Sequence, residues 1–283
     1  CGIERNILMT QLIDPVEYTK TLGLLRSFFL SKDFLEVHTQ NRLSILAACE
    51  DPTTVSTYNY IDEMGKQNIW PLPQTGQMWL EYELLTKPDS KGFFCISTSY
   101  RQEPNLIPGR HDVIFPMFEF EMPGNFDDLE KLERELCEYM GLGEITAKDY
   151  DEWANIYNTR EIDSEIERLM FAAHGACMIK NFPNHTSPFW NMKQNKDGNT
   201  AAKIDVILGG METIGSAERS TDVVEMREMF NTISDGGYAK LLHDLFGRDR
   251  VQAELDEFLS HDFFPRVGGG IGLTRMISAL NGK

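Results

Sequence analysis

The segment DVIFPMFEFEM, residues 112–122, carries two carboxylates at strand spacing. Successive side chains of a strand point to opposite faces, so Phe115, Met117, Glu119 and Glu121 share one face. Two carboxylates beside an aromatic ring are unusual on a buried strand, because burying an unpaired charge is costly. The segment therefore indicates either a binding face or an edge strand with a solvated side.

The preceding segment STSYRQEPN brings positive charge to the same neighbourhood. Arg101 and Glu103 share a strand face, and Arg110 and His111 follow after a turn-forming stretch. A guanidinium group can grip phosphate oxygens at two points. Phe115 offers an apolar face on which a base can stack. Together these residues favour a nucleotide site.

YRQE followed by RHDVIFPMFEFEM resembles the second signature of the class II aminoacyl-tRNA synthetases of the asparagine/aspartate type. In that signature an Arg-x-Glu strand, a loop and a returning strand hold ATP. The resemblance implies that Arg101 holds the α-phosphate, Glu103 faces the adenine side and Phe115 stacks on adenine. It also implies that Arg110 and His111 reach the outer phosphates.

The segment GGGIGLTR, residues 268–275, resembles the third signature of the same family, a glycine-rich turn ending in an arginine at a helix start. Glycines let the backbone approach a nucleotide closely, and a helix start favours anions. The resemblance implies that Gly272 borders ATP and that Arg275 binds the terminal phosphate. Thr274 stands where the family usually has an acidic residue, and ammonia-dependent asparagine synthetase has a small hydroxyl residue there.

IDVILGGMETIGSAERS resembles the family segment that supplies magnesium ligands and a reader of the substrate side chain. Asp205 and Glu212 match its acidic positions, and hard oxygen ligands suit Mg²⁺ that bridges ATP phosphates. Arg219 matches the arginine that fixes the carbonyl or carboxylate of the substrate side chain. Ala217 replaces a family serine, which alters the pocket. The alternative is a surface strand with ordinary acidic residues.

The segment PQTGQMWLEYELL resembles the Ser-Gly-Gln-Leu-x-x-Glu of asparaginyl enzymes, and it adds amino-acid-binding residues to Glu119. These are Thr75, Gln77 and Glu81. Leu80 stands where aspartyl enzymes have a lysine, and Glu81 would repel aspartate while accepting a hydrogen bond from an amide. Asparagine is therefore favoured over aspartate, unless Gln77 and Glu81 lie on a solvated helix face.

Two further positions depart from the family. Ile114 replaces a glutamate of the second signature, which removes one polar contact to ATP. SKDFLEVHTQ follows the first signature, but Gln40 replaces its proline. Because that strand usually builds the dimer interface, a homodimer is expected.

The elements that must position these residues follow from local patterns. Asp14 and Pro15 predict a helix from 14 to 30, which leads into the short strand FLEVHT. Segments 92–103 and 112–122 predict an antiparallel hairpin. A helix is expected from Asn125, a strand with a glycine break over 203–216, and helices over 223–233, 238–246 and 251–259 before a final strand, glycine turn and helix.

Strands without βαβ regularity predict an α+β fold. The resemblance implies the class II synthetase fold, a mainly antiparallel sheet flanked by helices, as a single domain over 1–283. The family's asparaginyl and aspartyl tRNA synthetases carry an N-terminal β-barrel for the anticodon, which is not expected here. Asparagine synthetases show the same stand-alone architecture.

Bulk properties restrict the partners. The net charge of −17 argues against broad phosphate-backbone binding, so a tRNA acceptor end is possible but not supported by charge. Without a membrane span or signal peptide, a cytoplasmic location with no membrane partner is expected. Scattered cysteines predict buried free thiols; they are Cys1, Cys49, Cys95, Cys137 and Cys177.

Three functions are compatible with the sequence. The first is an AMP-forming, ATP- and Mg²⁺-dependent ligase that activates asparagine for a tRNA end, a carrier or a small molecule. The second is an ammonia-dependent asparagine synthetase that acts on aspartate. The third is a non-catalytic synthetase-like binding or regulatory protein. Retention of Arg101, Arg219 and Arg275 disfavours the third, because a dead site has no physical need for these charges.

Overall fold

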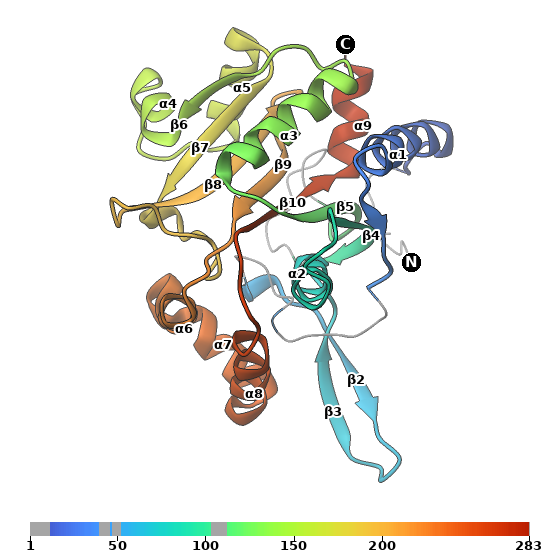
Figure 1. The fold of residues 1–283 in the computed structure, drawn as a ribbon, viewed down its shortest axis with the longest axis vertical. Coiled ribbons are helices and arrows are strands. Elements are labelled where there is room, and N and C mark those ends of the chain that lie inside the picture. Colours follow the sequence, from blue (N-terminus) through green and yellow to red (C-terminus); the bar gives the residue numbers. More distant parts are fainter. Residues whose placement is uncertain (1–11, 40–45, 47–51, 103–111, 283) are drawn as a thin grey trace, which may run out of the picture.

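An eight-stranded sheet forms the centre of the protein. The computed structural model describes residues 12–39, 46, 52–102 and 112–282. The strand order is β1-β4-β5-β10-β9-β8-β7-β6 (Figure 1). In that order, the strands span Leu35–Glu36, Phe93–Tyr100, Ile114–Pro123, Arg266–Gly272, Met211–Glu218, Thr200–Leu208, Cys177–Pro183 and Thr146–Asp149. All pairs are antiparallel except the two outermost, which confirms the predicted mainly antiparallel α+β fold.

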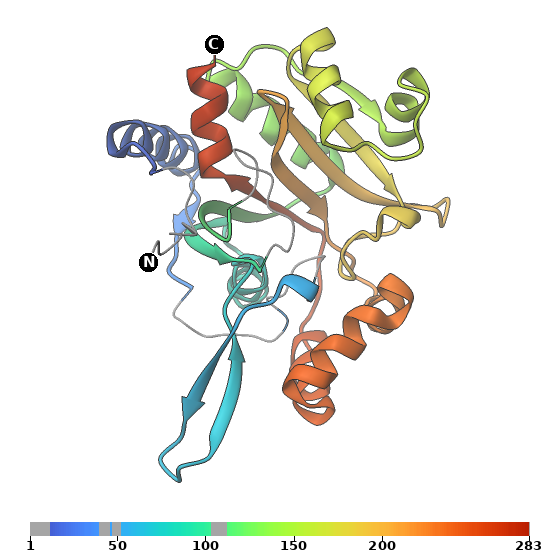
Figure 2. The ribbon, with the colours of Figure 1, turned by 180° about the vertical axis from the view of Figure 1, so that it is seen from behind.

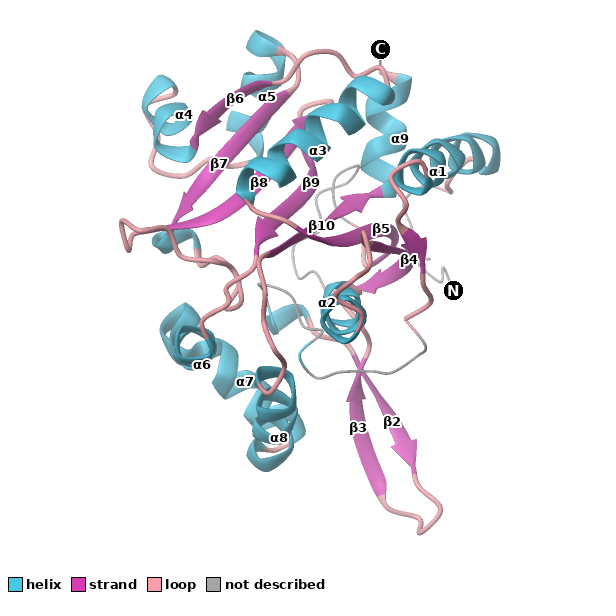
Figure 3. Cartoon of the chain, in the orientation of Figure 1, coloured by secondary structure: helices cyan, strands magenta, loops and turns pink. Residues whose placement is uncertain are grey.

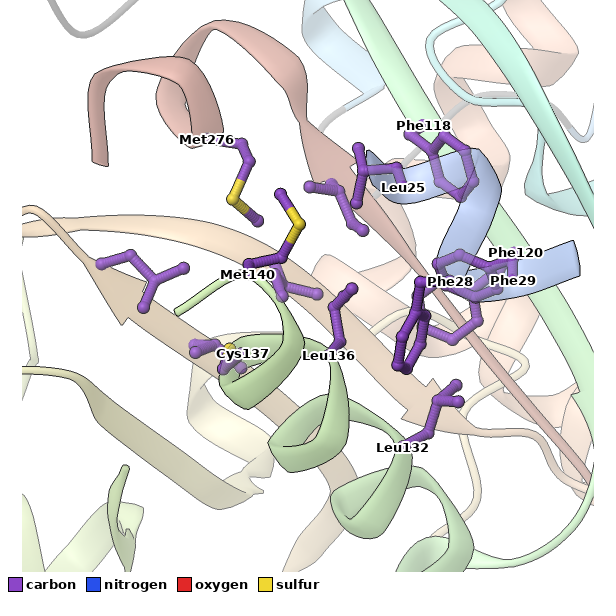
Figure 4. Close-up of a cluster of buried hydrophobic side chains, with 14 of the residues drawn as sticks. Leu25, Phe28, Phe29, Phe118, Phe120, Leu132, Leu136, Cys137, Met140 and Met276 are labelled. Carbon is purple, nitrogen blue, oxygen red and sulfur yellow. The ribbon is translucent and has the colours of Figure 1, made fainter. Parts of the chain in front are cut away.

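Three helices pack against one face of this sheet. They are α1 Pro15–Leu30, α3 Phe126–Tyr139 and α9 Leu273–Asn281. Side chains from all three meet Phe118 and Phe120 of β5 in one apolar cluster (Figure 4). The ring centroid of Phe29 lies 5.0 Å from that of Phe118 and 5.1 Å from that of Phe120. Burying each such side chain contributes roughly 1.5–3 kcal/mol, so the cluster fixes β5 from one side and leaves its other face for the carboxylates.

The opposite face carries a different set of helices. They are α2 Gln77–Thr86, α6 Val223–Thr232, α7 Gly237–Phe246 and α8 Arg248–Leu259. Helix α2 contacts β4, β5 and β10, and the other three form an apolar cluster that reaches the sheet at Ala201 and Ala217. Strands β2 (Thr57–Ile61) and β3 (Gln67–Pro71) form a hairpin that extends away from the rest of the molecule (Figure 2).

Two more helices pack against the sheet at the end where β6 lies. They are α4 Tyr150–Ile156 and α5 Ser164–His174, which pack around the buried Trp153. Single 3₁₀ turns occur at Pro52–Thr54, Asn184–Thr186 and Ile233–Gly236. Helices therefore lie on both sides of a continuous strand layer (Figure 3).

Several predicted elements are confirmed. Asp14 caps α1, since its carboxylate accepts the N–H groups of Val16 and Glu17 at 2.9 and 3.0 Å. Segments 92–103 and 112–122 contain β4 and β5, which pair as the predicted hairpin. Helix α3 begins after its cap Asn125, and α6, α7 and α8 match the three predicted helical stretches.

Two predictions about glycines were wrong. The segment 203–216 is not one strand with a break but parts of β8 and β9, joined at Gly209 and Gly210 with φ of 58° and 82°. Both values lie in the left-handed region that glycine adopts without strain. The predicted glycine turn after Arg266 is instead the extended strand β10, which holds Gly268, Gly269 and Gly270.

Cys95, Cys137 and Cys177 are buried free thiols, as expected; Cys1 and Cys49 lie outside the described residues. In the part of the chain that the structure describes, each helix is too short or too polar to cross a membrane.

Candidate active site

Three glycines lie side by side in the middle of the sheet. Gly270 of β10 is paired with Gly215 of β9 and with Glu119 of β5, and Gly268 is paired with Glu121. Paired residues of neighbouring strands share a face, so these positions border one another on the face opposite the main apolar cluster. We refer to Gly215, Gly268 and Gly270 as the glycine floor.

The glycine floor makes room for carboxylates from both sides. A Cβ at Gly268 would lie 1.8 Å from Oε2 of Glu121, and one at Gly215 would lie 2.8 Å from Oε1 of Glu212. No real side chain tolerates such contacts without displacement. The floor therefore lets acidic side chains of adjacent strand positions converge over the centre of the sheet.

Glu119 is buried at one border of the floor and is held by several donors. The Gly76 N–H lies 2.8 Å from Oε2, and the hydroxyls of Thr75 and Ser97 donate to the same carboxylate. Burial raises the pKa of Glu119, while hydrogen bonds from Ser97, Thr75 and Gly76 act in the opposite direction. The structure thus brings together the predicted Thr75 and Glu119 and adds Ser97, which sequence analysis did not identify.

Glu121 and Arg219 form a two-point ion pair. Arg219 donates Nε to Oε1 at 3.2 Å and Nη2 to Oε2 at 3.1 Å, and both residues are buried. Gln77 donates its amide to the Phe120 carbonyl at 3.0 Å and to the Gly269 carbonyl at 3.3 Å. Burial raises the pKa of Glu121, and the charge of Arg219 opposes this shift. Gln77 and Arg219 therefore both contact Glu121 beside the glycine floor.

Glu81 is not on a solvated helix face, because it is completely buried. Arg266 donates to its Oε2 from Nε at 3.1 Å and from Nη2 at 2.7 Å. Asn191 donates its amide to Oε1 at 2.6 Å, and Nε of Arg219 lies 3.7 Å from the same oxygen. Neither Arg266 nor Asn191 was among the predicted site residues. The position of Arg266 just before a run of glycines is the feature of the sequence that indicates it.

Arg101 and Phe115 lie together at the end of the β4–β5 hairpin. The guanidinium carbon of Arg101 is 5.4 Å from the centroid of the Phe115 ring. The charge of Arg101 also contributes to lowering the pKa of Glu119, against the larger effect of burial. The predicted Glu103, Arg110 and His111 lie outside the described residues.

Asp205, Glu212 and Arg275 border the floor on its other side. A Cβ at Gly215 would lie 3.5 Å from Oδ1 of Asp205, so both carboxylates approach the same glycine. Arg275 donates Nη1 to the Glu212 backbone carbonyl at 2.5 Å, and that nitrogen is 3.9 Å from Oε2 of the Glu212 side chain. Gly272 directly precedes α9, and Arg275 is the third residue of that helix, as predicted for an arginine at a helix start.

The donor set fits Mg²⁺ that is shared with a phosphate ligand. Among the described residues, no group of three or more His, Cys, Asp or Glu side chains could hold a metal ion. Asp205 and Glu212 supply two carboxylates, and Mg²⁺ commonly takes one or two carboxylates together with substrate phosphates and water.

A family model described as tRNA synthetases class II (D, K and N) matches residues 17–283. The chain belongs to this family. The match covers nearly the whole chain, including all the segments that build the floor and its borders. The class II synthetase resemblance seen in the sequence is thereby confirmed.

Curated relatives of this class II chain include two bacterial asparagine–tRNA ligases. The protein of Psychromonas ingrahamii is 31% identical over 125 residues, which are 43% of this chain and 24% of that ligase. The protein of Aliivibrio fischeri is 29% identical over 127 residues, with the same coverage. The chain thus matches about a quarter of the length of these relatives.

Solved structures confirm the class II synthetase fold. The asparaginyl-tRNA synthetase of Pyrococcus horikoshii, complexed with asparaginyl-adenylate, superposes with a TM-score of 0.74 at 18% identity, over 94% of this chain and 64% of that one. The asparaginyl-tRNA synthetase of Entamoeba histolytica gives 0.73 at 18% identity, over 95% and 64%. At this identity the similarity establishes the architecture of the core.

Proposed function

We propose that this protein is an AMP-forming ligase that activates an amino acid with ATP. The observation that carries the proposal is the glycine floor, with Arg101 and Glu119 at one border and Arg275 at the other. In the proposed reaction the substrate carboxylate attacks the α-phosphorus of ATP in line. Catalysis then needs positioning and fixed positive charge rather than a side-chain nucleophile.

The side chains divide between the two ends of ATP. Arg101 holds the α-phosphate, and Phe115 stacks on adenine beside it, with Glu103 facing the adenine side. Arg275, whose position is fixed by the Glu212 carbonyl, holds the terminal phosphate, with Arg110 and His111 as further phosphate ligands. Asp205 and Glu212 would hold Mg²⁺, and the bound ion would supply positive charge beside the ATP phosphates.

The amino acid is proposed to lie between Glu119 and the buried ion pairs. Glu119, oriented by Thr75 and Gly76, accepts the α-ammonium group. Arg219 and Gln77 face the substrate side chain.

Asparagine is the substrate that this arrangement favours. The formal charges of Glu81, Glu121, Arg219 and Arg266 sum to zero, so a neutral amide adds no uncompensated charge. The asparagine–tRNA ligases among the relatives support the same choice.

One observation also supports a second candidate, an ammonia-dependent asparagine synthetase that uses aspartate. Because Arg266 neutralises Glu81, this carboxylate repels an aspartate side chain less than its sequence position implied. Thr274 agrees with this candidate, since the asparagine synthetases resemble the chain at that position.

Pyrophosphate exchange with each proteinogenic amino acid tests the proposal. Asparagine-dependent exchange supports the first candidate and aspartate-dependent exchange the second. Arg101→Ala should abolish exchange without unfolding the protein, whereas the exposed control Arg168→Ala should retain it. If no amino acid supports exchange while ATP still binds, the chain is a non-catalytic member of the family.

We also propose that the protein forms a homodimer through β1, whose Leu35 is 56% exposed. The strand corresponds to the first family signature. Light scattering of the purified protein and of Leu35→Glu tests this, because the variant should be monomeric. A cytoplasmic location is proposed on the same family basis.

A further inference from the structure

A cavity of about 680 Å³ lies beside the proposed amino-acid site. It is bounded by α2, α8, the base of the β2–β3 hairpin and the outer edge of β4. Strand β1 pairs with β4 only at Phe93 and Phe94, so the later residues of β4 are not covered by that strand. The cavity is large enough for a small organic molecule.

Aromatic rings form much of the wall. Trp79 and Tyr82 of α2 lie with ring centroids 5.3 Å apart, and His261 meets Tyr82 edge-on at 5.6 Å. Trp70 lines the cavity from β3, and one of its faces already holds a cation, since the guanidinium carbon of Arg250 is 4.0 Å from its centroid. Aromatic faces attract cations electrostatically, most strongly in the case of tryptophan.

Two carboxylates give the cavity its charge. Glu254 and Glu257 lie three residues apart on α8, Phe258 follows on the same helix, and His261 lies just beyond the helix end. None of the lining residues that the structure describes is a lysine or an arginine. A wall that combines aromatic faces with carboxylates favours an organic cation.

The cavity shares residues with the site over the glycine floor. Thr75, Gly76 and Ser97 line the cavity, and the same three residues bind the carboxylate of Glu119. A molecule in the cavity therefore lies against the residues that bind Glu119, the carboxylate proposed to accept the α-ammonium group of the amino acid. This contiguity makes the cavity suited to a second substrate.

We propose that the cavity binds an organic cation that carries an amine, and that this amine is the acceptor of the activated amino acid. The acceptor role rests on the proposed ligase function, whereas the binding site does not. After loss of one proton, the amine nitrogen attacks the carbonyl carbon of the aminoacyl-adenylate. A C–N bond forms, the C–O bond to phosphate breaks with its electron pair leaving on AMP, and the nitrogen releases a second proton to solvent. The product is an amide.

Tyramine and 3-(4-hydroxyphenyl)propionate form a matched pair of probes, since they share a ring and differ in the sign of their charge. Calorimetric titration of the whole chain should show that tyramine binds at least about 10-fold more tightly than 3-(4-hydroxyphenyl)propionate does. Glu254→Gln/Glu257→Gln should weaken tyramine binding by at least about 10-fold. The control Glu228→Gln/Asp249→Asn, which changes net charge equally outside the cavity, should bind as the wild type does. Equal affinity for the two probes, or an unaffected double variant, would overturn the binding site.

The acceptor role is tested with the amino acid that supports pyrophosphate exchange. Tyramine, agmatine and spermidine are each added with ATP and Mg²⁺, and products are analysed by mass spectrometry. An amide of at least one amine, with AMP released faster than without amine, is expected, and Glu254→Gln/Glu257→Gln should reduce amide formation while exchange persists. Exchange without any amide, or transfer to tRNA alone, would refute the acceptor role. Charge-selective tyramine binding without exchange for any amino acid would refute the ligase function and leave the binding site standing.

Discussion

Arg266 donates both Nε and Nη2 to a single oxygen of Glu81, at 3.1 and 2.7 Å, and both residues are buried. This contact joins the first residue of β10 to the middle of α2, and the two residues lie 185 positions apart in the chain. A buried charge is costly unless it is paired and hydrogen-bonded, so this pair fixes α2 over the site.

Arg266→Met should therefore destabilise the protein by about 3–5 kcal/mol, because it leaves the Glu81 charge buried without its main partner. Glu81→Gln/Arg266→Met removes both charges and should lose less stability than the single variant. Urea unfolding of the two variants and the wild type measures the difference. Equal stability of Arg266→Met and wild type would contradict the assigned role.

The burial of Glu133 in α3 predicts that the folded protein loses stability as the pH rises. This residue is completely buried, and burial raises its pKa to about 8. In the unfolded chain the carboxyl ionises near the ordinary value of 4.5. Between these values only the unfolded state has lost the proton, so stability falls as pH rises through this window, by up to about 1.4 kcal/mol for each pH unit.

Glu133→Gln should remove this loss. The variant should be more stable than the wild type in urea unfolding at pH 8.5 and nearly equal at pH 4.5. Glu130→Gln is the control on the same helix: ion pairs with Lys180 and Arg134 lower the pKa of Glu130 despite partial burial, so its replacement should not stabilise at high pH. A stability gain for Glu133→Gln that is the same at both pH values would show that the carboxyl is not titrating in this window.

Local patterns in the sequence predicted the elements whose signals are contained in one segment. The helix starts at Asp14 and at Asn125 and the alternation in β5 depend on residues a few positions apart, and all three are confirmed. The alternation also placed Glu119 and Glu121 on one face, opposite Phe118 and Phe120.

Contacts that depend on strand order were not predictable in the same way. Glu81 meets Arg266 only because β10 lies beside β5 beneath α2, and Glu133 is buried only because α3 packs over Ser216 of β9. The segment between 140 and 200 gave no clear pattern, because β6 is only four residues long and β7 carries a register shift near Lys180.

Glycines in this chain should respond to substitution in opposite directions. A Cβ at Gly268 would lie 1.8 Å from Oε2 of Glu121 and 2.4 Å from the backbone oxygen of Phe120, so Gly268→Ala should destabilise by about 3 kcal/mol or more. Gly23 lies exposed in α1 with nothing within 4 Å of its Cβ position. Gly23→Ala should therefore stabilise by about 0.5–1 kcal/mol through helix propensity. Thermal unfolding of both variants checks the pair, and a tolerated Gly268→Ala would argue against the register of β10 with β5.

The carboxylates beside Gly215 should set the magnesium requirement of the proposed reaction. Asp205 and Glu212 approach Gly215 from neighbouring strands. Arg275 donates a hydrogen bond to the backbone carbonyl of Glu212, so its position does not depend only on the Glu212 side chain. Asp205→Asn should therefore raise the Mg²⁺ concentration for half-maximal pyrophosphate exchange by at least about 10-fold, while leaving ATP binding in the absence of Mg²⁺ unchanged.

Asp197→Asn is the matched control, since Asp197 caps an exposed turn through the Asn199 and Thr200 N–H groups and borders no part of the floor. Its Mg²⁺ dependence should equal that of the wild type.

Lys203 is expected to compete with Mg²⁺ for Asp205, because its Nζ lies 3.3 Å from Oδ2 of Asp205. Lys203→Met should therefore lower the Mg²⁺ concentration that the reaction requires. If Asp205→Asn and Lys203→Met shift the requirement in the same direction, the carboxylate acts by holding Lys203 instead of the metal.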